Sequence, residues 1–482
     1  MRRKFLSNLI FLLFLNLLVK PFWILGIDRG VQNAIGAEGY GFYYAILNFS
    51  FLFNIILDFG ITQFNNRNIA RHSHLLDKYL PNIIVLKISL SMIYTIVIFI
   101  TGIAIGYNAV QLKMLAILGL NQFLLSFILY LRSNISGLLM FKTDSMLSVL
   151  DRLIVIGIMS VLLWGNIAPG PLKIEWYILA QTVAYVFTAV TALVIVLQKA
   201  SLKRLKWKKN LVLLILKQSY PFAILVLLMT FYNRIDSVML ERLLPSVENC
   251  RQAGIYASAN RLLEAANMIA LLFAGLLLPI FARMIKMKES PEKLIKLAFT
   301  ILLCISVTVS FISCFYGDHI MRLLYHDHQM ESAQVFRWLM FGFIPISSSY
   351  VFGTLLTANG NLRQLNFIAV GGIVINLSLN LLLIPVYKAC GSAFASITTQ
   401  FMMAILQFAL VIKIFSFRFE IHYFLKNSLF VGGVVLMGFL STYLPWSWII
   451  NICILLAAIV LFALVLRILS LKSFFRILRN EQ

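Results

Sequence analysis

Long apolar windows, separated by short polar segments, follow one another along the whole chain. Each window runs for about 20 residues without the alternation of a half-buried strand, which is the length of a helix that crosses a bilayer. Because lipid offers backbone amides no partners, only helices or closed barrels can span it, and the pattern predicts an all-α integral membrane protein. About 14 transmembrane helices are predicted, near residues 8–27, 40–63, 83–106, 112–131, 146–164, 176–197, 219–240, 255–281, 297–316, 335–356, 365–385, 391–411, 427–444 and 447–470.

The connections between the windows are short. Turn residues such as Asn359-Gly360 and Leu444-Pro445 fall between windows, and no predicted loop exceeds about 20 residues. A soluble catalytic or receptor domain therefore has no room on either face. The protein is predicted to act within the membrane and not to be an enzyme.

Lysine and arginine are distributed unevenly among the predicted loops. An even number of helices places both ends of the chain on one side, and that side holds most of the basic loops and both basic tails. Because positive charge is retained in cytoplasmic loops, both termini are predicted to be cytoplasmic. The densest basic run, 203–209, joins the sixth and seventh windows and is predicted to contact anionic membrane lipids.

The composition excludes several classes of protein. Of 482 residues 61% are apolar and 12% are charged, so lipid must solvate most of the surface. The formal charge of +23 does not indicate nucleic-acid binding, because the basic residues lie between apolar windows and not on one polar face. Five widely spaced cysteines form no CxxC pair, which gives no support to a redox, cofactor or metal function.

A weak internal repeat relates the two halves of the chain. A shift of 213 residues places Gly41 to Ala45 on Gly254 to Ser258 and maps the first six windows onto windows seven to twelve. Two six-helix lobes around a central cavity are expected, related by an axis near the membrane normal, with a helical hairpin added at the C-terminus. The predicted parts are an N-terminal lobe (1–198), a basic cytoplasmic linker (199–218), a C-terminal lobe (219–412) and two additional helices with a basic tail (413–482).

Two groups of motifs give the chain a resemblance to a known family. The first group is GAEGYG at 36–41, LDFG at 57–60 and NNRNIAR at 65–71, and the second is YNRIDSVML at 232–240 and AGIYASANRLLE at 253–264. On these motifs the chain resembles the polysaccharide-biosynthesis, or oligosaccharide flippase, family of the multidrug/oligosaccharidyl-lipid/polysaccharide exporter (MOP) superfamily. The resemblance covers nearly the whole chain.

That resemblance implies a substrate and a location. Such proteins carry undecaprenyl-pyrophosphate-linked repeat units of O-antigen or another exopolysaccharide across the bacterial inner membrane, through a cavity that opens alternately to each side. Membrane lipids, the lipid-linked oligosaccharide and the polysaccharide polymerase machinery are the partners that it implies. Coupling to Na⁺ or H⁺ is left open.

Charged side chains inside the windows are the best pointers to a polar cavity, because each is costly unless it is paired or faces water. Arg234 and Asp236 lie in the seventh window, and Arg261 and Glu264 lie in the eighth. Arg261 and Glu264 are three residues apart on a helix, so an ion pair between them is expected, and they either lock the helices or line the cavity. Arg234 and Arg261 are the leading candidates for binding a pyrophosphate.

The first lobe offers further candidates. Lys20 stands inside the first window beside a proline, where a kink frees backbone carbonyls, and it either faces the cavity or snorkels. Asp28 and Arg29 follow at the outer end, either as a solvated interfacial pair or, for Arg29, as a cavity residue. Lys87 is expected to snorkel to the cytoplasmic face.

Asp58 is the candidate for coupling an ion, near the cytoplasmic end of the second window. A single carboxylate does not identify that ion, and a structural pairing with a nearby arginine is the alternative. Asp151 and Arg152 are expected to form an interfacial pair or to contact the pyrophosphate at the inner mouth of the cavity.

Four alternatives stay open. A lipid II flippase and a drug/cation antiporter of the same superfamily differ in cargo, although the excess of arginine over carboxylate candidates favours an anionic one. From another class, a membrane O-antigen polymerase or ligase would need an outer loop with arginine and histidine. The longest predicted outer loop, 317–334, contains His319, Arg322, His326 and His328. A metal site at these histidines is the fourth alternative, against a solvated loop.

Overall fold

The computed structural model describes residues 15–16, 18–62, 65–66, 69, 76–165, 170–200, 209–417 and 421–466. In the helix that begins at residue 209, side chains are described from residue 223 onward. Predictions about the start of the first window, both basic tails and the basic run up to residue 208 lie outside these residues.

All regular elements among the described residues are helices. They are η1 (Trp23–Asp28), α2 (Arg29–Leu52), α3 (Ile55–Asp58), α5 (Leu76–Ala104), α6 (Ala109–Gly137), α7 (Phe141–Trp164), α8 (Ile174–Leu197), α9 (Lys209–Leu243), α10 (Asn249–Lys286), α11 (Glu292–Leu324), α12 (Gln329–Phe341), α13 (Phe343–Ala358), α14 (Leu362–Phe415), α15 (Ile421–Ser441) and α16 (Trp448–Val465). Each predicted window lies on helix at least in part, so the all-α membrane fold is confirmed.

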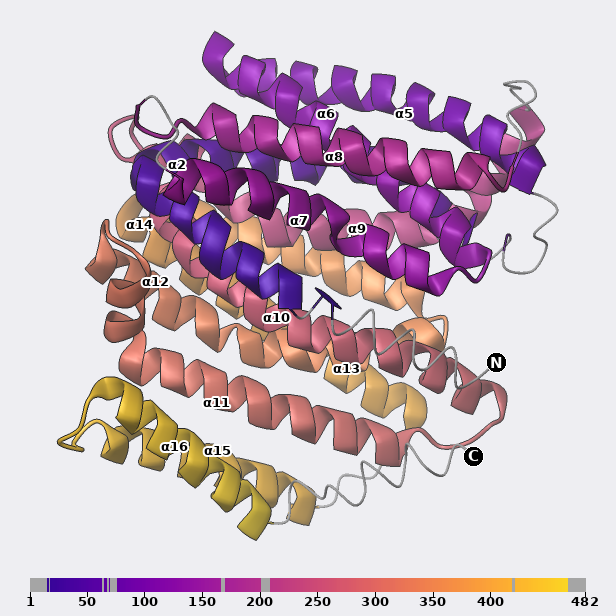
Figure 1. Cartoon of the computed structure of the whole chain (residues 1–482). Helices are drawn as coiled ribbons and strands as arrows, with labels where there is room; N and C mark the ends of the chain where they lie inside the picture. The colour runs from indigo at the N-terminus through magenta and orange to yellow at the C-terminus, as the bar shows by residue number, and fades with distance from the viewer. Residues whose placement is uncertain are drawn as a thin grey trace. The chain divides into compact units, whose positions relative to one another are not determined.

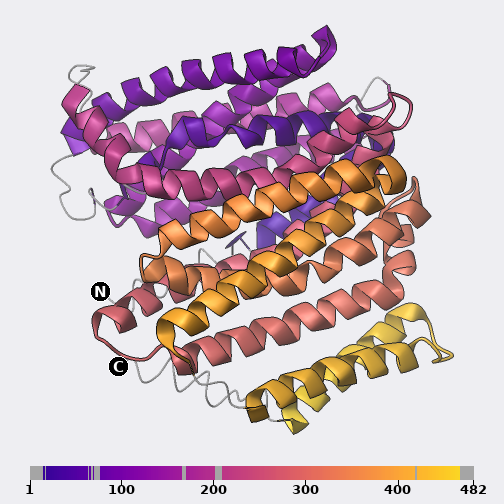
Figure 2. The same cartoon turned by 180° about the vertical axis from the view of Figure 1, so that it is seen from behind.

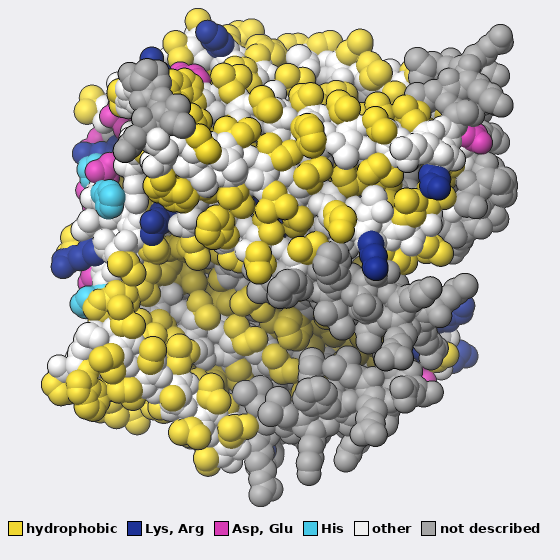
Figure 3. Space-filling model, viewed as in Figure 1, with side chains coloured by type: hydrophobic (Ala, Val, Ile, Leu, Met, Phe, Trp, Pro, Cys, Tyr) yellow, Lys and Arg dark blue, Asp and Glu magenta, His cyan; other side chains and the backbone are white. Residues whose placement is uncertain are grey.

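Eleven helices of the described part are long and apolar enough to cross a membrane. Within each unit of the fold the long helices run alongside one another (Figure 1). On the face drawn in Figure 3, hydrophobic side chains cover most of the described surface, and charged side chains gather mainly toward the helix ends. This arrangement matches a bilayer, which solvates apolar side chains at mid-depth and charged groups at its surfaces.

One of the eleven helices is a hairpin. The backbone of α14 leaves the helical region at Lys388, with φ 53° and ψ −131°. A Cβ built on Gly372 would lie 2.7 Å from Sδ of Met403, so the segments before and after Lys388 lie side by side. Figure 2 shows the two antiparallel segments. The break predicted between windows eleven and twelve is therefore confirmed.

A similar reversal joins the first two windows. Inside α2, Gly36 has φ 83° and ψ 166°, a conformation that a residue with a Cβ rarely adopts. The hydroxyl of Tyr40 donates a hydrogen bond of 2.7 Å to Oδ2 of Asp28, so the segments on either side of Gly36 meet.

The second window was predicted as one helix, but in the structure it is broken. α2 ends at Leu52, α3 is a single turn, and Phe59 and Gly60 follow with φ 44° and 77°. Apolar windows do not reveal such a break, because the polar groups that satisfy the freed backbone come from other helices. Lys87 of α5, for example, donates to the carbonyl of Leu57.

The outer loop predicted at 317–334 is also much shorter than expected. α11 continues to Leu324 and α12 begins at Gln329, which leaves residues 325–328 as the connection. Polar residues such as Arg322 therefore lie on helix beyond the apolar window. His326 and His328 do lie on the connection, as predicted.

The chain divides into two compact units. The first holds residues 1–257 with 380–388, and the second holds residues 258–379 with 389–482. In the first, the N-terminal half of the chain packs with α9 and the beginning of α10. In the second, α15 and α16 pack on α11, where Leu455 and Ile459 share a buried cluster with Cys304 and Val307. The four predicted parts with boundaries at 198, 218 and 412 stay a prediction.

Candidate functional site

A glycine crossing joins α2 to α10 in the first unit. A Cβ built on Gly41 would lie 1.9 Å from the carbonyl oxygen of Cys250, and one built on Gly254 would lie 1.9 Å from that of Ala37. Only a residue without a side chain allows such an approach. The side chain of Gln32 adds a hydrogen bond of 3.0 Å to the carbonyl of Gly254.

The crossing is symmetric with respect to the internal repeat. The 213-residue shift that places Gly41 on Gly254 also places Ala37 on Cys250. Gly41 approaches the carbonyl of Cys250 and Gly254 approaches the carbonyl of Ala37, so the shift converts one contact into the other. This is the reciprocal pattern of a two-fold axis. We call the end of the helices at this crossing the outer end, following the predicted orientation.

A second contact at the outer end joins α6 to α9. Glu241, which is 3% exposed, accepts a hydrogen bond of 2.7 Å from Gln111 and lies 2.7 Å from Nε of Arg242. The Arg242 guanidinium lies 4.2 Å from the ring centre of Tyr107 and donates to the carbonyl of Ile105. The connection between α5 and α6 is thereby tied to the end of α9.

Glu248 and Lys388 form the third contact at this end, outside the membrane-spanning segments. Nζ of Lys388 lies 2.8 Å from Oε2 and 3.0 Å from Oε1 of Glu248. The hydrogen bond from Lys388 lowers the pKa of the Glu248 carboxyl below its ordinary value, aided by the charges of Lys388 and Arg251. The pair fixes the turn of the α14 hairpin to the start of α10.

Arg234 of α9 is held by a neutral amide and a ring. Its NH1 donates a hydrogen bond of 3.1 Å to Oδ1 of Asn48, and its guanidinium lies 5.1 Å from the ring centre of Phe51. Asn48 is 2% exposed, and its Nδ2 donates to Oγ of Ser237 at 2.8 Å. The guanidinium thus lies against the face of α2 that continues from Gly41.

Asp236 is buried on α9, two residues after Arg234. It is 1% exposed and accepts hydrogen bonds from the hydroxyl of Tyr256 at 2.7 Å and from Nδ2 of Asn380 at 2.8 Å. The carboxylate therefore joins α9, α10 and the first segment of α14. Sequence reasoning placed Asp236 among the cavity residues but did not find its partners.

Arg261 and Glu264 form the predicted ion pair, with 2.9 Å between NH1 and Oε2. Arg261 stands seven residues after Gly254 on α10, so the helical period puts both on one face. The side chain of Arg261 is 8% exposed and that of Glu264 is 24% exposed. Whether the pair binds a substrate stays a prediction.

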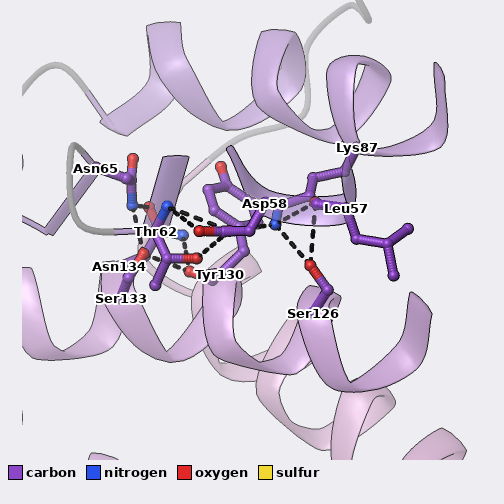
Figure 4. Close-up of polar contacts among 9 residues, drawn as sticks. All are labelled: Leu57, Asp58, Thr62, Asn65, Lys87, Ser126, Tyr130, Ser133 and Asn134. Atoms are coloured by element: carbon purple, nitrogen blue, oxygen red, sulfur yellow. Dashed lines mark hydrogen bonds and ion pairs between the residues drawn. The ribbon is translucent and has the colours of Figure 1, made fainter. Parts of the chain in front are cut away.

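Lys87 was expected to snorkel to the cytoplasmic face, but this prediction is wrong. It forms a buried ion pair with Asp58 (Figure 4). Its Nζ lies 2.6 Å from Oδ1 of Asp58, 2.9 Å from the carbonyl of Leu57 and 2.8 Å from Oγ of Ser126, and its side chain is 1% exposed. All three ammonium protons thus have an acceptor. Asp58 also accepts from Thr62, so the coupling candidate is already bound by a cation of the protein itself.

The remaining first-lobe candidates differ from one another. Asp28 is 1% exposed and accepts from Tyr40 and Tyr177, so it is buried and hydrogen-bonded to tyrosines and not the solvated partner of Arg29 that we expected. Arg29 is half-buried. Lys20 is half-buried too and lies within electrostatic reach of Arg152, Arg132 and Asp151.

Asp151 forms its predicted ion pair with Arg152, at 3.4 Å. The Arg152 guanidinium also lies 4.1 Å from the ring centre of Trp23, which ties α7 to η1. The pair therefore has a structural part in the first unit, and its contact with a pyrophosphate stays a prediction.

Sequence reasoning missed the polar residues that position the charged ones. Asn48, Ser237, Tyr256 and Asn380 are all buried. A single buried amide or hydroxyl gives no signal within an apolar window. The signal that was present lay in the repeat, because it had already aligned Gly41 with Gly254.

Two family models match the sequence. The model described as Polysaccharide biosynthesis protein matches residues 5–285, and the model described as Lipid II flippase MurJ matches residues 153–459. Each match covers more than half of the chain. A search of curated protein sequences finds no match.

Several solved structures share the fold. One is described as the lipid II flippase MurJ in an inward closed conformation, with a TM-score of 0.67 and 13% identity over 92% of this chain and 97% of the other. Another is an inward-facing multidrug resistance transporter of the MATE family, with a TM-score of 0.63 and 14% identity over 82% and 94%. A third is a MOP superfamily transporter from Pyrococcus furiosus, with a TM-score of 0.55 and 14% identity over 85% and 94%.

Proposed function

Since the chain belongs to the flippase families of the MOP superfamily that the polysaccharide biosynthesis and lipid II flippase models represent, we propose that it flips a lipid-linked oligosaccharide. The cargo is an undecaprenyl-pyrophosphate-linked repeat unit of O-antigen or another exopolysaccharide. It enters from the cytoplasmic leaflet of a bacterial inner membrane and leaves in the outer leaflet by alternating access.

The observation that carries the proposal is the setting of Arg234. A guanidinium within a membrane-spanning helix costs free energy unless it is paired or faces a polar cavity, and such residues often mark a substrate path. One hydrogen bond of the Arg234 guanidinium goes to the amide of Asn48, and its flat face lies near the ring of Phe51. A pyrophosphate would supply oxygen acceptors that match the planar array of guanidinium donors.

Arg261 supports the same cargo from the other half of the repeat. Glu264 occupies part of its donor array, and a pyrophosphate would compete for that pairing. Asp236, Lys20 and Arg29 complete the proposed cavity residues, with the sugars contacting polar groups and the prenyl chain left in lipid.

A lipid II flippase is the second candidate, favoured by the family model that matches residues 153–459. Lipid II shares the undecaprenyl pyrophosphate and differs in the sugar and peptide part, so the same arginines would bind it. A drug/cation antiporter would instead need carboxylates in place of the arginines. A polymerase or ligase would have its catalytic arginine and histidine residues on the outer face, where it would act after the flipping step.

Coupling and partners complete the proposal. Asp58 is the site at which Na⁺ or H⁺ would act, and Lys87 would have to release the carboxylate for a cation to enter. In this proposal both termini lie in the cytoplasm, and the polymerase that consumes the flipped units is the expected neighbour.

The test is the composition and sidedness of lipid-linked sugars in cells that lack the protein. The deletion cells are complemented with equal amounts of one of four proteins: wild type, Arg234→Ala, Arg261→Ala or the control Arg251→Ala. Arg251 is an arginine on the same helix as Arg261 and pairs with Glu248 at the outer end.

The proposal expects complete, unpolymerised repeat units to accumulate on the cytoplasmic face. Wild type and Arg251→Ala should relieve the accumulation, and the other two variants should not. Lipid II accumulating in their place would identify the second candidate. Units accumulating on the outer face would contradict a flippase and indicate a polymerase or ligase.

A further inference from the structure

The break in the second window brings a backbone carbonyl to the ammonium of Lys87 (Figure 4). α3 ends at Asp58, and Phe59 follows in the left-handed region with φ 44°. Carbonyls in the last turn of a helix are common acceptors for side-chain donors. The carbonyl of Leu57 accepts from Nζ of Lys87 at 2.9 Å and from Oγ of Ser126 at 3.1 Å.

The oxygen atoms around Lys87 are of the kinds that bind metal cations. Its Nζ lies 2.6 Å from Oδ1 of Asp58 and 2.8 Å from Oγ of Ser126, in addition to the carbonyl of Leu57. Carboxylate, backbone carbonyl and serine hydroxyl oxygens are all ligands of hard cations in proteins. An ammonium has three protons, so these three acceptors satisfy it. The site is therefore a cation site whose occupant is covalently attached to α5.

The internal repeat indicates that the fold does not require charges at this point. The 213-residue shift places Asp58 on Leu271 and Lys87 on Thr300. Leu271 lies within α10, and its side chain is exposed. The second half thus has a continuous helix with an apolar residue where the first half has a break with a carboxylate. The ion pair belongs to this break and not to the architecture that the two halves share.

The two members of the pair differ in exposure. The side chain of Asp58 is 27% exposed, and that of Lys87 is 1% exposed. Oγ1 of Thr62 also donates to Oδ1 of Asp58, at 2.5 Å. A free Na⁺ at the inner position would have to displace Lys87 from its three acceptors. That exchange would leave a buried ammonium without its carboxylate, which is strongly unfavourable.

We propose that Lys87 is a tethered cation, which takes the place of an exchangeable Na⁺ at Asp58. The ammonium neutralises the carboxylate and ties α3 to α5 and α6 without an ion from solution. The inference rests on the proposed function, since it names the cation at the site proposed for ion coupling. It implies that this site does not draw on a sodium gradient. It also implies that a Na⁺ site appears when the amine is removed and its space is left open.

Thermal unfolding of the purified full chain in detergent tests the inference. The unfolding temperature is measured in NaCl and in choline chloride at equal ionic strength, for wild type, Lys87→Ala, Lys87→Met and Lys87→Ala/Asp58→Asn. Alanine leaves the space of the amine open to an ion. Methionine is the matched control, because it is also uncharged and its long, flexible side chain fills much of that space. The sodium effect is the unfolding temperature in NaCl minus that in choline chloride, and wild type gives the baseline for any other site.

We expect the same sodium effect in wild type and in Lys87→Met. In Lys87→Ala the effect should be larger by about 3 °C, at a sodium concentration of about ten times its Kd. Lys87→Ala/Asp58→Asn should return to the baseline, because the carboxylate that binds the ion is gone. The assay contains no cargo, so a failure of this inference is distinguished from a failure of the flippase proposal.

Three results would overturn the inference. A sodium effect in wild type that is lost in Asp58→Asn/Lys87→Met would show that Na⁺ binds at Asp58 with the lysine present. This comparison also decides the question if Lys87→Ala does not fold, and an unchanged effect then supports the tethered cation. Equal sodium effects in Lys87→Ala and Lys87→Met would mean that the oxygen atoms form no cation site. A gain in Lys87→Ala that persists after Asp58→Asn would place the ion elsewhere.

Discussion

Replacing Gly254 by alanine would add one methyl group at the closest approach between α2 and α10. The new Cβ would lie 1.9 Å from the carbonyl oxygen of Ala37 and 2.6 Å from its carbon. Carbon and oxygen atoms need more than about 3 Å, so the two helices must separate by roughly 1 Å, and overpacking of this kind costs about 1–3 kcal/mol.

That cost falls only on the arrangement in which the outer end is closed. If the protein alternates with a state whose outer end is open, a penalty of about 1–3 kcal/mol shifts the balance toward that state by roughly 5- to 150-fold. Gly41→Ala should act in the same direction and to a similar extent, because its Cβ would lie at the same distance from the carbonyl of Cys250.

The thiol of Cys250 at the crossing reports the change. With the other four cysteines replaced, we expect a membrane-impermeant maleimide to label Cys250 faster in Gly254→Ala and Gly41→Ala than in the parent. Gly157→Ala is the control, because nothing lies within 4 Å of a Cβ built there. Equal labelling rates in all four proteins would refute the idea that the glycine crossing closes the outer end.

Two further predictions concern ion pairs. Asp58→Asn should lower the free energy of unfolding by about 3 kcal/mol, because it leaves the Lys87 ammonium buried without its carboxylate. The double variant Asp58→Asn/Lys87→Met should recover much of that loss. Unfolding in detergent measures both variants, and equal stability of the single and double variants would contradict the pairing. The lowered pKa of Glu248 means that its pairing with Lys388 stabilises the fold above the ordinary pKa of a glutamate and is lost as the pH falls through the lowered value. The protection factors of the backbone amides at residues 386–390, which are corrected for the intrinsic exchange rate at each pH, should therefore fall on acidification in wild type and not in Lys388→Gln; an equal fall in both would contradict the prediction.

The sequence alone predicts the helices well because the bilayer imposes one rule on all of them. Apolar windows located the helices, and the turn at Asn359-Gly360 and the reversal near Lys388 fell between windows. Helix ends were predicted less well, because polar turns such as the one containing Arg322 are still helical once they leave the apolar region.

Charged residues were harder to place than helices. Lys87 looked like a snorkelling anchor because its acceptors, Asp58 and Ser126, come from other helices. Asp28 looked solvated for the same reason, since two tyrosine hydroxyls satisfy it. Position along one helix gives the depth of a side chain, but only tertiary packing gives its partner.

Flipping in a purified system tests the central claim most directly. Full-length protein is placed in vesicles that carry undecaprenyl-pyrophosphate-linked oligosaccharide, and the fraction exposed to an added glycan-modifying enzyme is followed with time. The account predicts that wild-type vesicles expose nearly all of the cargo, that Arg234→Ala vesicles expose it much more slowly, and that protein-free vesicles expose only the outer half. Exposure no faster with wild type than in protein-free vesicles, for this cargo and for lipid II alike, would contradict a flippase.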